Sequence, residues 1–178
     1  MKKIIRILSV SALLATAAAA QAQVYVEGAY TPLSVKIDGD SVKPAALSGI
    51  VGYEVNPNLA VEGFLALGAK KVSVSDQYGS ADLKVSKSFG VFLKPKVMLN
   101  DSTEVFARVG FAQSTLKVNL TDSQGSFSSS GSNGSFAYGL GGNYYLNKQT
   151  YLTGSYMSFY NKDGLKVTGF NLGAGYKF

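Results

Sequence analysis

Apolar and polar residues alternate along most of the chain with a period of two. The last stretch shows this clearly, because one face carries Phe170, Leu172, Ala174, Tyr176 and Phe178 while the residues between them are Asn, Gly and Lys. Successive side chains of a strand point to opposite sides, so this period predicts β-strands rather than helices. Similar alternation recurs near 24–30, 47–55, 61–68, 88–97, 105–112, 136–144 and 150–160. The pattern therefore predicts eight strands; in the seventh we place Leu152, Gly154, Tyr156 and Tyr160 on the apolar face.

Two kinds of connection join the predicted strands. Three are short and rich in turn-forming residues, at 56–58, 100–102 and 147–149. Longer or looser connections are expected at 33–41, 75–82 and 119–134, with a tight one at 161–164. Within the third, the Ser- and Gly-rich residues 125–134 predict a mobile loop tip. Short turns at one end and longer loops at the other are typical of outer-membrane barrels, whose turns lie in the periplasm.

The first 22 residues have the pattern of a secretory signal peptide. Basic residues precede an apolar stretch over 7–20, and Ala20-Gln21-Ala22 supplies the small residues that signal peptidase recognises. A membrane anchor is the alternative, but this stretch is shorter than the roughly 20 apolar residues that span a bilayer. We predict cleavage between Ala22 and Gln23, with cleavage after Ala20 as the alternative. The predicted domains are thus a signal peptide at 1–22 and a barrel at 23–178.

Missing residue types exclude several kinds of chemistry. The chain has no Cys, which removes disulfides, thiolate metal sites and a lipoprotein anchor. It has no His, the commonest metal ligand and general base. Lys84, Ser86, Lys87 and Ser88 lie close together, but Ser and Lys are too common in such strands for this to indicate a catalytic dyad. We predict no enzyme activity, no cofactor and no metal.

The face opposite the apolar one distinguishes a membrane barrel from a soluble one. It carries mostly Gly, Ala and Ser with isolated charges, whereas a water-exposed face would carry denser Lys, Glu and Thr. Aromatic residues also gather near strand ends, as they do at membrane interfaces. Those near the turns are Tyr53, Tyr144, Tyr151, Tyr176 and Phe178, and those near the loops are Phe136, Tyr138 and Tyr160. We therefore predict that the apolar face meets lipid, where a soluble barrel would turn it inward.

The last strand carries a family resemblance. A C-terminal Phe178 with Tyr176, Ala174, Leu172 and Phe170 on the same face resembles the terminal strand that the outer-membrane assembly machinery recognises. The chain as a whole resembles the OmpA/OmpX/Opa-type small outer-membrane barrels. The resemblance implies an all-β, eight-stranded antiparallel up-and-down transmembrane β-barrel, exported to the outer membrane and assembled there by that machinery. Unlike OmpA, the chain ends with the barrel, so we expect no periplasmic peptidoglycan-binding domain, and we expect a monomer.

Six charged residues fall on the face that this assignment turns inward: Glu27, Glu54, Glu62, Lys94, Lys96 and Arg108. The interior of an eight-stranded barrel is just wide enough for its side chains, and unpaired charges there are costly. We therefore favour an interior that paired charges plug. A narrow, charge-lined path for ions or small solutes is the alternative.

The remaining charge is concentrated at the loop end. The whole chain has a net charge of +6, and residues 1–22 hold three basic and no acidic residues, which leaves +3 without them. Nine Lys and six Asp lie around the loops, so this end carries all of the excess. We expect contact with lipopolysaccharide phosphates through Lys70, Lys71, Lys84 and Lys87. A generic solvated rim is the alternative.

Two classes of function remain. The first is a structural and surface-interaction role through extracellular loops and contact with lipopolysaccharide. The second is a narrow porin-like or ligand-binding barrel for ions or small solutes. The narrow predicted interior favours the first, and nucleic acid is not expected as a partner of an exported chain.

Overall fold

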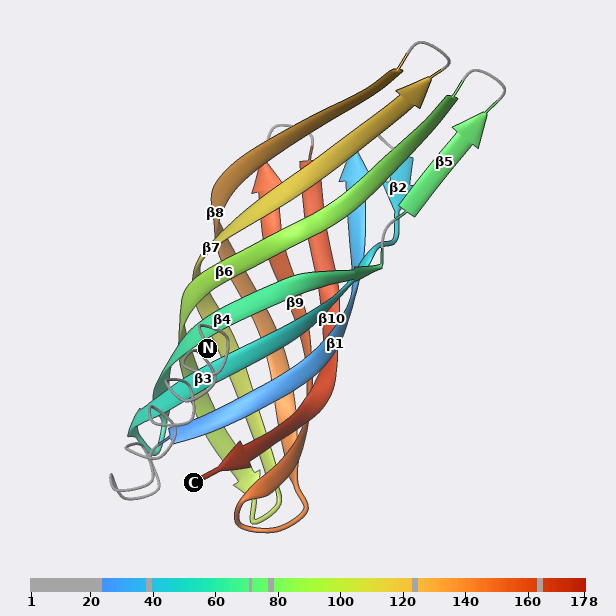
Figure 1. Cartoon of the computed structure of the whole chain (residues 1–178). Coiled ribbons are helices and arrows are strands. Elements are labelled where there is room, and N and C mark those ends of the chain that lie inside the picture. The colour runs from blue at the N-terminus through green and yellow to red at the C-terminus, as the bar shows by residue number, and fades with distance from the viewer. Residues whose placement is uncertain (1–23, 38–39, 71, 77–78, 123–124, 163–164) are drawn as a thin grey trace, which may run out of the picture.

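The computed structural model describes residues 24–37, 40–70, 72–76, 79–122, 125–162 and 165–178 (Figure 1). Over this part of the chain no helix is long and apolar enough to cross a membrane. The strands are β1 (Val24–Ile37), β2 (Asp40–Val42), β3 (Ala45–Asn56), β4 (Leu59–Lys70), β5 (Val72–Asp76), β6 (Gly79–Asn100), β7 (Thr103–Asp122), β8 (Gly125–Tyr145), β9 (Thr150–Lys162) and β10 (Leu165–Lys177).

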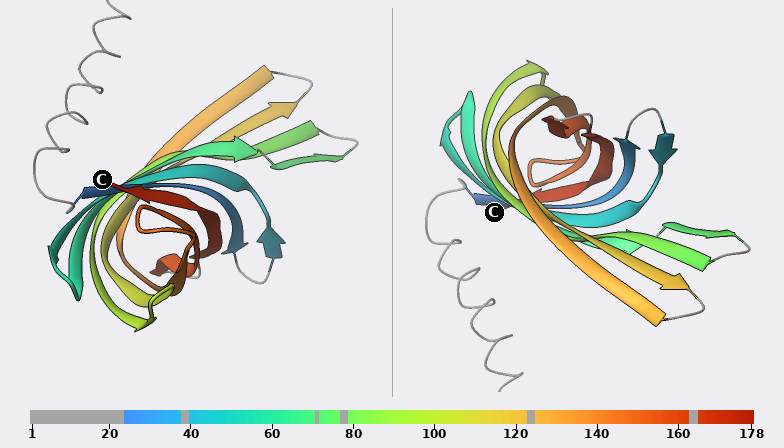
Figure 2. Two further views of the ribbon diagram at one scale, coloured as in Figure 1. Left: turned by 90° about the horizontal axis from the view of Figure 1, so that it is seen from below. Right: turned by 90° about the horizontal axis from the view of Figure 1, so that it is seen from above.

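Eight of these strands close a barrel. Each pairs antiparallel with the next in the order β1, β3, β4, β6, β7, β8, β9, β10, and β10 pairs back with β1. The short strands β2 and β5 are additions that pair with β1 and β6 toward one end of the barrel. Figure 2 shows the strands curving around a common axis. The predicted eight-stranded antiparallel up-and-down barrel is confirmed.

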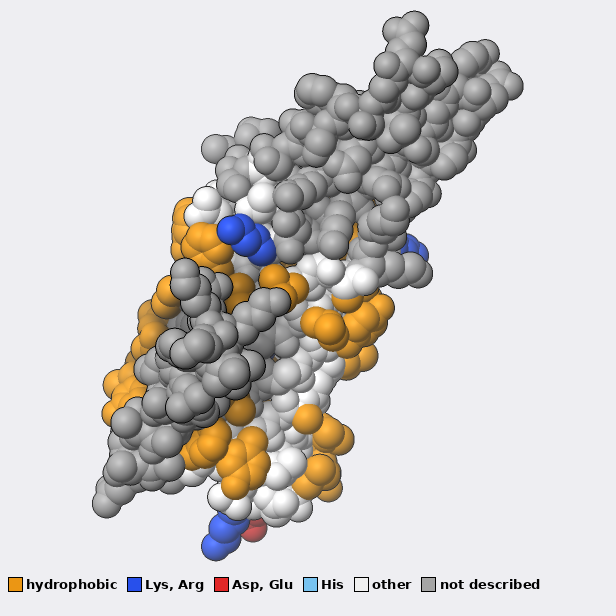
Figure 3. Space-filling model, in the orientation of Figure 1, with side chains coloured by type: hydrophobic (Ala, Val, Ile, Leu, Met, Phe, Trp, Pro, Cys, Tyr) orange, Lys and Arg blue, Asp and Glu red, His pale blue; other side chains and the backbone are white. Residues whose placement is uncertain are grey.

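The apolar face of the alternation lies on the outside of the barrel. Phe170 and Leu172 of β10 are 55% and 58% exposed, whereas Asn171 between them is buried. The other strands follow the same rule, and Figure 3 shows hydrophobic side chains over the outer wall in view. Because each of the eight barrel strands pairs on both sides within the barrel, the wall offers lipid an apolar surface with its backbone groups already hydrogen-bonded.

An asparagine organises each of the three short turns. The side-chain oxygen of Asn56 accepts from the backbone N–H of Asn58 at 2.9 Å. Asn100 accepts from Ser102 in the same way, and Asn147 accepts from the two backbone N–H groups at 149 and 150. These contacts replace the backbone hydrogen bonds that a tight reversal loses, which is why Asn recurs at these positions. We call this end of the barrel the turn end and the opposite end the loop end.

The predicted loops at 33–41, 75–82 and 119–134 are largely wrong. Strands β6, β7 and β8 continue as a sheet beyond the barrel, and the β7–β8 pairing runs out to Asp122 opposite Gly125 (Figure 1). The Ser- and Gly-rich residues 125–134 are therefore part of strand β8 and not a loop tip. Small polar side chains give no burial signal in the sequence, but the backbone of β7 supplies hydrogen bonds whatever the side chains are.

The seventh barrel strand, β9, differs from the prediction at one aromatic residue, Tyr151. Leu152 and Tyr156 lie on the outer face as predicted, but Tyr151 is only 2% exposed and points inward, so it does not belong to the aromatic belt. Val167 pairs with Tyr160 and Thr168 with Ser158, which leaves Phe159 as an extra residue in a β-bulge. At the bulge Ser158 is buried together with Met157 and Phe159, although simple alternation would place Ser158 outside.

Candidate functional site: the barrel interior

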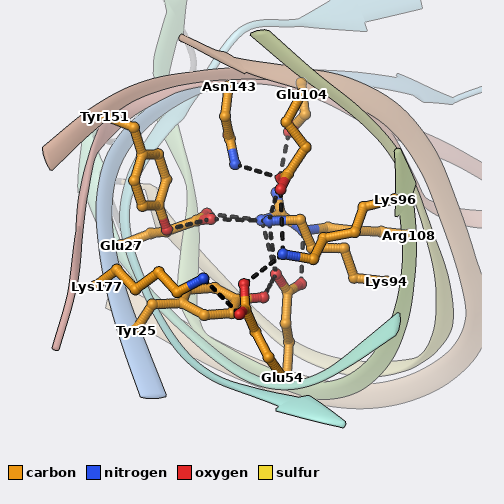
Figure 4. A network of polar contacts seen from close by, with 12 residues as sticks. Tyr25, Glu27, Glu54, Lys94, Lys96, Glu104, Arg108, Asn143, Tyr151 and Lys177 are labelled. Atoms are coloured by element: carbon orange, nitrogen blue, oxygen red, sulfur yellow. Dashed lines mark hydrogen bonds and ion pairs between the residues drawn. The ribbon is translucent and has the colours of Figure 1, made fainter. Parts of the chain in front are cut away.

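The structure brings all six predicted interior charges together and adds two more. Four carboxylates and four basic groups join in one network of ion pairs near the turn end (Figure 4). We call this set the ionic cluster; its members are Glu27, Glu54, Glu62, Glu104, Lys94, Lys96, Arg108 and Lys177. The formal charges of the cluster cancel, which is the condition under which so many buried charges are tolerated.

Two cations, Lys94 and Arg108, stand at the centre of the ionic cluster. The β6–β7 ladder pairs Leu93 with Val109 and Lys96 with Phe106, so the register sets Lys94 opposite Arg108. The ladder is interrupted there because Pro95 has no N–H to donate. Two like charges directly across a sheet repel each other, so this arrangement depends on the carboxylates around it.

Glu27 and Glu62 supply most of that compensation. Arg108 donates to Glu27 through Nη2 at 2.6 Å, and to Glu62 through Nε at 2.6 Å and Nη2 at 3.0 Å. The Lys94 ammonium lies 3.4 Å from Glu27 and 3.6 Å from Glu62. Each carboxylate therefore bridges both cations, and the double contact with the Arg108 guanidinium fixes the geometry.

A second tier of ion pairs lies closer to the turn end. Glu104 lies 3.1 Å from the Lys96 ammonium and 3.7 Å from that of Lys94, so it connects the two tiers. Glu54 pairs with Lys96 and also with Lys177, the latter at 2.5 Å. The amide of Asn143 donates to Glu104 at 2.8 Å. This tier joins strands β3, β6, β7, β8 and β10 across the barrel.

Interior tyrosines hold the carboxylates in place, and glycines leave space for the tyrosine rings. Tyr25 donates to Glu62 at 2.6 Å, and Tyr151 donates to Glu27 at 3.1 Å. The Tyr25 ring lies directly over Gly52, where an added Cβ would stand 2.1 Å from the ring. A side chain at this position of β3 would therefore displace the ring from the cluster.

A cavity of about 640 Å³ opens beside the second tier at the turn end. Its walls include Glu54, Lys96, Glu104, Tyr145 and Lys177, together with residues of all three short turns. The Glu54 and Lys177 side chains are 12% and 26% exposed, whereas those of the first tier are almost completely buried. The second tier is therefore more open to water at the turn end than the first.

On the loop side of the ionic cluster, none of the described interior side chains is charged. On one side the Phe64 ring stacks on Phe159 at 5.7 Å and meets Phe92 edge-on at 5.9 Å. On the other side Thr31 donates to Asn171 at 2.7 Å, and Asn171 donates to Ser155 at 3.0 Å. Every buried charged side chain in the described part of the chain belongs to the ionic cluster. We call this region the Phe64 layer; it comprises Ile50, Phe64, Phe92, Met157 and Phe159 with Thr31, Ser48, Ser155 and Asn171.

Glu104 and Lys177 are the interior charges that sequence reasoning missed. Glu104 continues the inward alternation of Phe106 and Arg108 by one step toward the turn, so extending the predicted strand 105–112 by one residue would have found it. The alternation of the last strand predicts an inward Lys177, but this residue is not among the six predicted interior charges. The described residues contain no group of three or more Asp or Glu side chains arranged to hold a metal ion.

The other predicted sites are placed less completely. Of the five residues expected to form the assembly signal, Phe170, Leu172, Ala174 and Tyr176 are exposed on the outer face of β10, and Phe178 follows the strand with its ring against Tyr176. Of the predicted rim lysines, Lys87 is exposed, and the side chains of Lys70, Lys71 and Lys84 lie outside the described part. The predicted cleavage site at Ala20, Ala22 and Gln23 also lies outside it.

A closed antiparallel barrel with an apolar outer wall and an ionic interior defines a transmembrane β-barrel. The chain belongs to the outer membrane protein beta-barrel domain family, which it matches over residues 6–178. Membership of this family locates the protein in the outer membrane.

Solved structures of small outer-membrane barrels resemble the chain. Ail, the attachment invasion locus protein of Yersinia pestis, is 24% identical, with a TM-score of 0.67 over 88% of this chain and 99% of Ail. Neisserial surface protein A is 14% identical, with a TM-score of 0.66 over 87% of this chain and 97% of that protein. OprG of Pseudomonas aeruginosa is 16% identical, with a TM-score of 0.53 over 88% and 96%. A search of curated proteins found no match.

Proposed function

We propose that the protein is a surface-interaction barrel that binds lipopolysaccharide phosphates at the loop end and contacts other surfaces through its extended sheet. The observation that carries the lipid contact is a pair of lysines. The register of β1 and β10 sets Lys36 directly opposite Lys166, and both are exposed. Like charges in this position repel each other, and a phosphate between them would turn the repulsion into attraction.

The position of the pair suits an outer-leaflet headgroup. Alternation places Lys36 on the outer face with Tyr30, and Lys166 on the outer face with Phe170, on the loop side of both aromatic residues. Lys87 lies in the same way beyond Phe89 on β6. The lysines thus stand where the apolar wall ends, which is the depth of lipid phosphates.

A structural neighbour gives independent support. Ail has been crystallised in complex with the heparin analogue sucrose octasulfate, so a barrel of this fold carries a polyanion. We transfer to this chain only the class of ligand, a dense array of anionic groups.

Charge reversal tests the lipid contact. Lys36→Glu with Lys166→Glu should weaken binding of purified lipopolysaccharide at least tenfold, because two attractions become repulsions. Reversal of Lys70, Lys71, Lys84 and Lys87 should add to the loss. Titration of the detergent-solubilised barrel would measure the affinity, with Lys148→Glu at the turn end as the matched control. An affinity unchanged by the loop-end substitutions would contradict the proposal.

The extended sheet supplies the second contact surface. Pairing of β8 with β9 begins at Tyr138, so residues 125–137 are paired with β7 on one side and not with β9 on the other. An unpaired strand edge presents N–H and C=O groups that an extended segment of another protein fits. We propose such a segment on a neighbouring cell or host surface as the partner.

Shortening the hairpin tests this surface. Leu116 lies opposite Gly131, so replacing residues 116–131 by Asn-Gly would close the β7–β8 hairpin earlier with a favourable turn. We expect bacteria that carry this variant to adhere less to host-cell monolayers while lipopolysaccharide affinity is retained. Unchanged adhesion by a normally folded variant would contradict a role for the extension.

The proposal also covers export and assembly. We propose that residues 1–22 are removed between Ala22 and Gln23, that β10 is read by the assembly machinery, and that the barrel at 23–178 works as a monomer without catalysis or cofactor. N-terminal sequencing of the outer-membrane protein would test the cleavage position. A pore for ions or small solutes is the competing function, and the filled interior is the observation against it.

A further inference from the structure

We infer that the Phe64 layer, and not the ionic cluster, is the permeability barrier of this barrel. On this view the turn-end cavity is a hydrated vestibule from which ions exchange into the ionic cluster, and the Phe64 layer closes the barrel beyond that cluster. Charged solutes from the turn side enter the vestibule and stop at the Phe64 layer.

The ionic cluster is poorly suited to be the barrier. Its second tier already meets water through the cavity, and Glu54, Lys96, Glu104 and Lys177 line that cavity. A small cation that arrives there meets carboxylates, and an anion meets ammonium groups. An entering ion therefore gains an oppositely charged side chain in exchange for the water that it loses. Charged rings and pairs of this kind line permeable filters in other channels.

The Phe64 layer has the opposite character. It holds no charged side chain, its apolar half consists of three packed phenyl rings with Ile50 and Met157, and these side chains are all buried. The hydroxyl and amide groups of its polar half are already engaged: Thr31, Asn171 and Ser155 bond with each other, and Ser155 also accepts from Arg108 at 3.4 Å. An ion in this layer would lose its hydration without gaining a charged partner, and apolar constrictions exclude water as well.

Phe64 is the central residue of the layer, because its ring contacts both Phe92 and Phe159. Truncation to Ala removes both ring contacts and leaves space directly above the buried carboxylates. Phe89 provides a matched control: it is also a phenylalanine, its strand β6 pairs with β4, and it lies on the outer face opposite Leu65. Both variants lose one phenyl ring, but only one of the rings is inside the barrel.

Single-channel recording in planar bilayers tests the inference. The unmodified protein and Phe89→Ala should give no conductance steps, and Phe64→Ala should give stable, salt-dependent steps. The double variant Glu54→Gln with Lys177→Gln removes the ion pairs of Glu54 with Lys96 and Lys177 without changing the net charge, and it should remain silent. Conductance of the unmodified protein, steps from this double variant, or silence of inserted Phe64→Ala would each overturn the inference.

A chemical measurement keeps the test decisive if Phe64→Ala does not insert. The chain has no Cys, so a single introduced thiol reports accessibility without background. Tyr145→Cys lies in the vestibule wall, and Ala66→Cys lies on the interior face of β4 beyond Phe64. A small charged methanethiosulfonate added from the turn side of reconstituted vesicles should modify Tyr145→Cys and spare Ala66→Cys. Equal modification of both, or of neither, would overturn the inference.

Discussion

At the scale of single residues, Glu62 shows how many hydrogen bonds and ion pairs depend on one buried carboxylate. It is completely buried, accepts two hydrogen bonds from Arg108 and one from Tyr25, and lies 3.6 Å from the Lys94 ammonium. Tyr25 in turn fits only because Gly52 has no side chain. Removing the charge of Glu62 would therefore affect two cations and a tyrosine together.

We predict that Glu62→Gln destabilises the barrel by about 3 to 5 kcal/mol, the usual cost of removing one partner of a buried ion pair. The physical reason is that Lys94 and Arg108 would then lie opposite each other with too little negative charge around them. Urea unfolding in lipid vesicles would measure the free energy of unfolding. Asp101→Asn makes the same acid-to-amide change at an exposed turn and should change stability by less than about 0.5 kcal/mol. Equal effects of the two substitutions would contradict the structural role of Glu62.

At the scale of elements, β10 both completes the barrel and carries the aromatic C-terminus. Its Cα register with β1 runs from Tyr25 opposite Lys177 to Ile37 opposite Leu165. Beyond the ladder, the N–H of Phe178 donates to the carbonyl of Val24 at 3.0 Å, and its ring packs edge-on against Tyr176 at 5.1 Å. Phe178 thus contributes a backbone hydrogen bond to the pairing of β10 with β1, and an aromatic ring to the outer face.

We predict that deleting Phe178 abolishes outer-membrane assembly, because the deletion removes both contributions and the aromatic end of the strand. Fractionation of expressing cells would show the protein lost from the outer membrane. Phe178→Ala keeps the backbone bond, and Phe178→Tyr keeps the ring as well, so a defect in the first but not the second would assign the effect to the ring. Normal insertion of the truncated chain would argue against β10 as an assembly signal.

At the scale of the whole molecule, closure makes the barrel resist detergent. Every barrel strand is hydrogen-bonded on both sides, so sodium dodecyl sulfate finds no open edge in the barrel wall where unfolding can begin. The ionic cluster adds cross-barrel contacts between strands that are not neighbours in the wall, such as Glu27 of β1 with Arg108 of β7.

We therefore predict that the unheated protein migrates faster on a gel than the boiled protein, since the closed barrel is more compact than the unfolded chain. Glu62→Gln should shift the temperature of conversion downward if the cross-barrel contacts contribute. A single mobility at all temperatures would contradict a closed, stable barrel.

The sequence by itself determined the strands, their faces and the class of fold. A period of two over eight stretches, such as Phe170 to Phe178, is a local property that survives without knowing which strands are neighbours. The same alternation sufficed to turn Glu27, Glu62 and Arg108 inward, because parity depends only on position along one strand. The three Asn-containing turns were also readable, since an Asn side chain bonds within its own turn.

Only the tertiary structure decided how the interior is arranged. Which carboxylate meets which cation depends on register and on the curvature of the wall, and both come from pairing between distant strands. Tyr151 was misplaced for the same reason, because the space over Gly175 that its ring occupies is a property of the neighbouring strand. The Ser- and Gly-rich part of β8 is a strand because β7 pairs with it, and no residue within 125–134 indicates this pairing from the sequence.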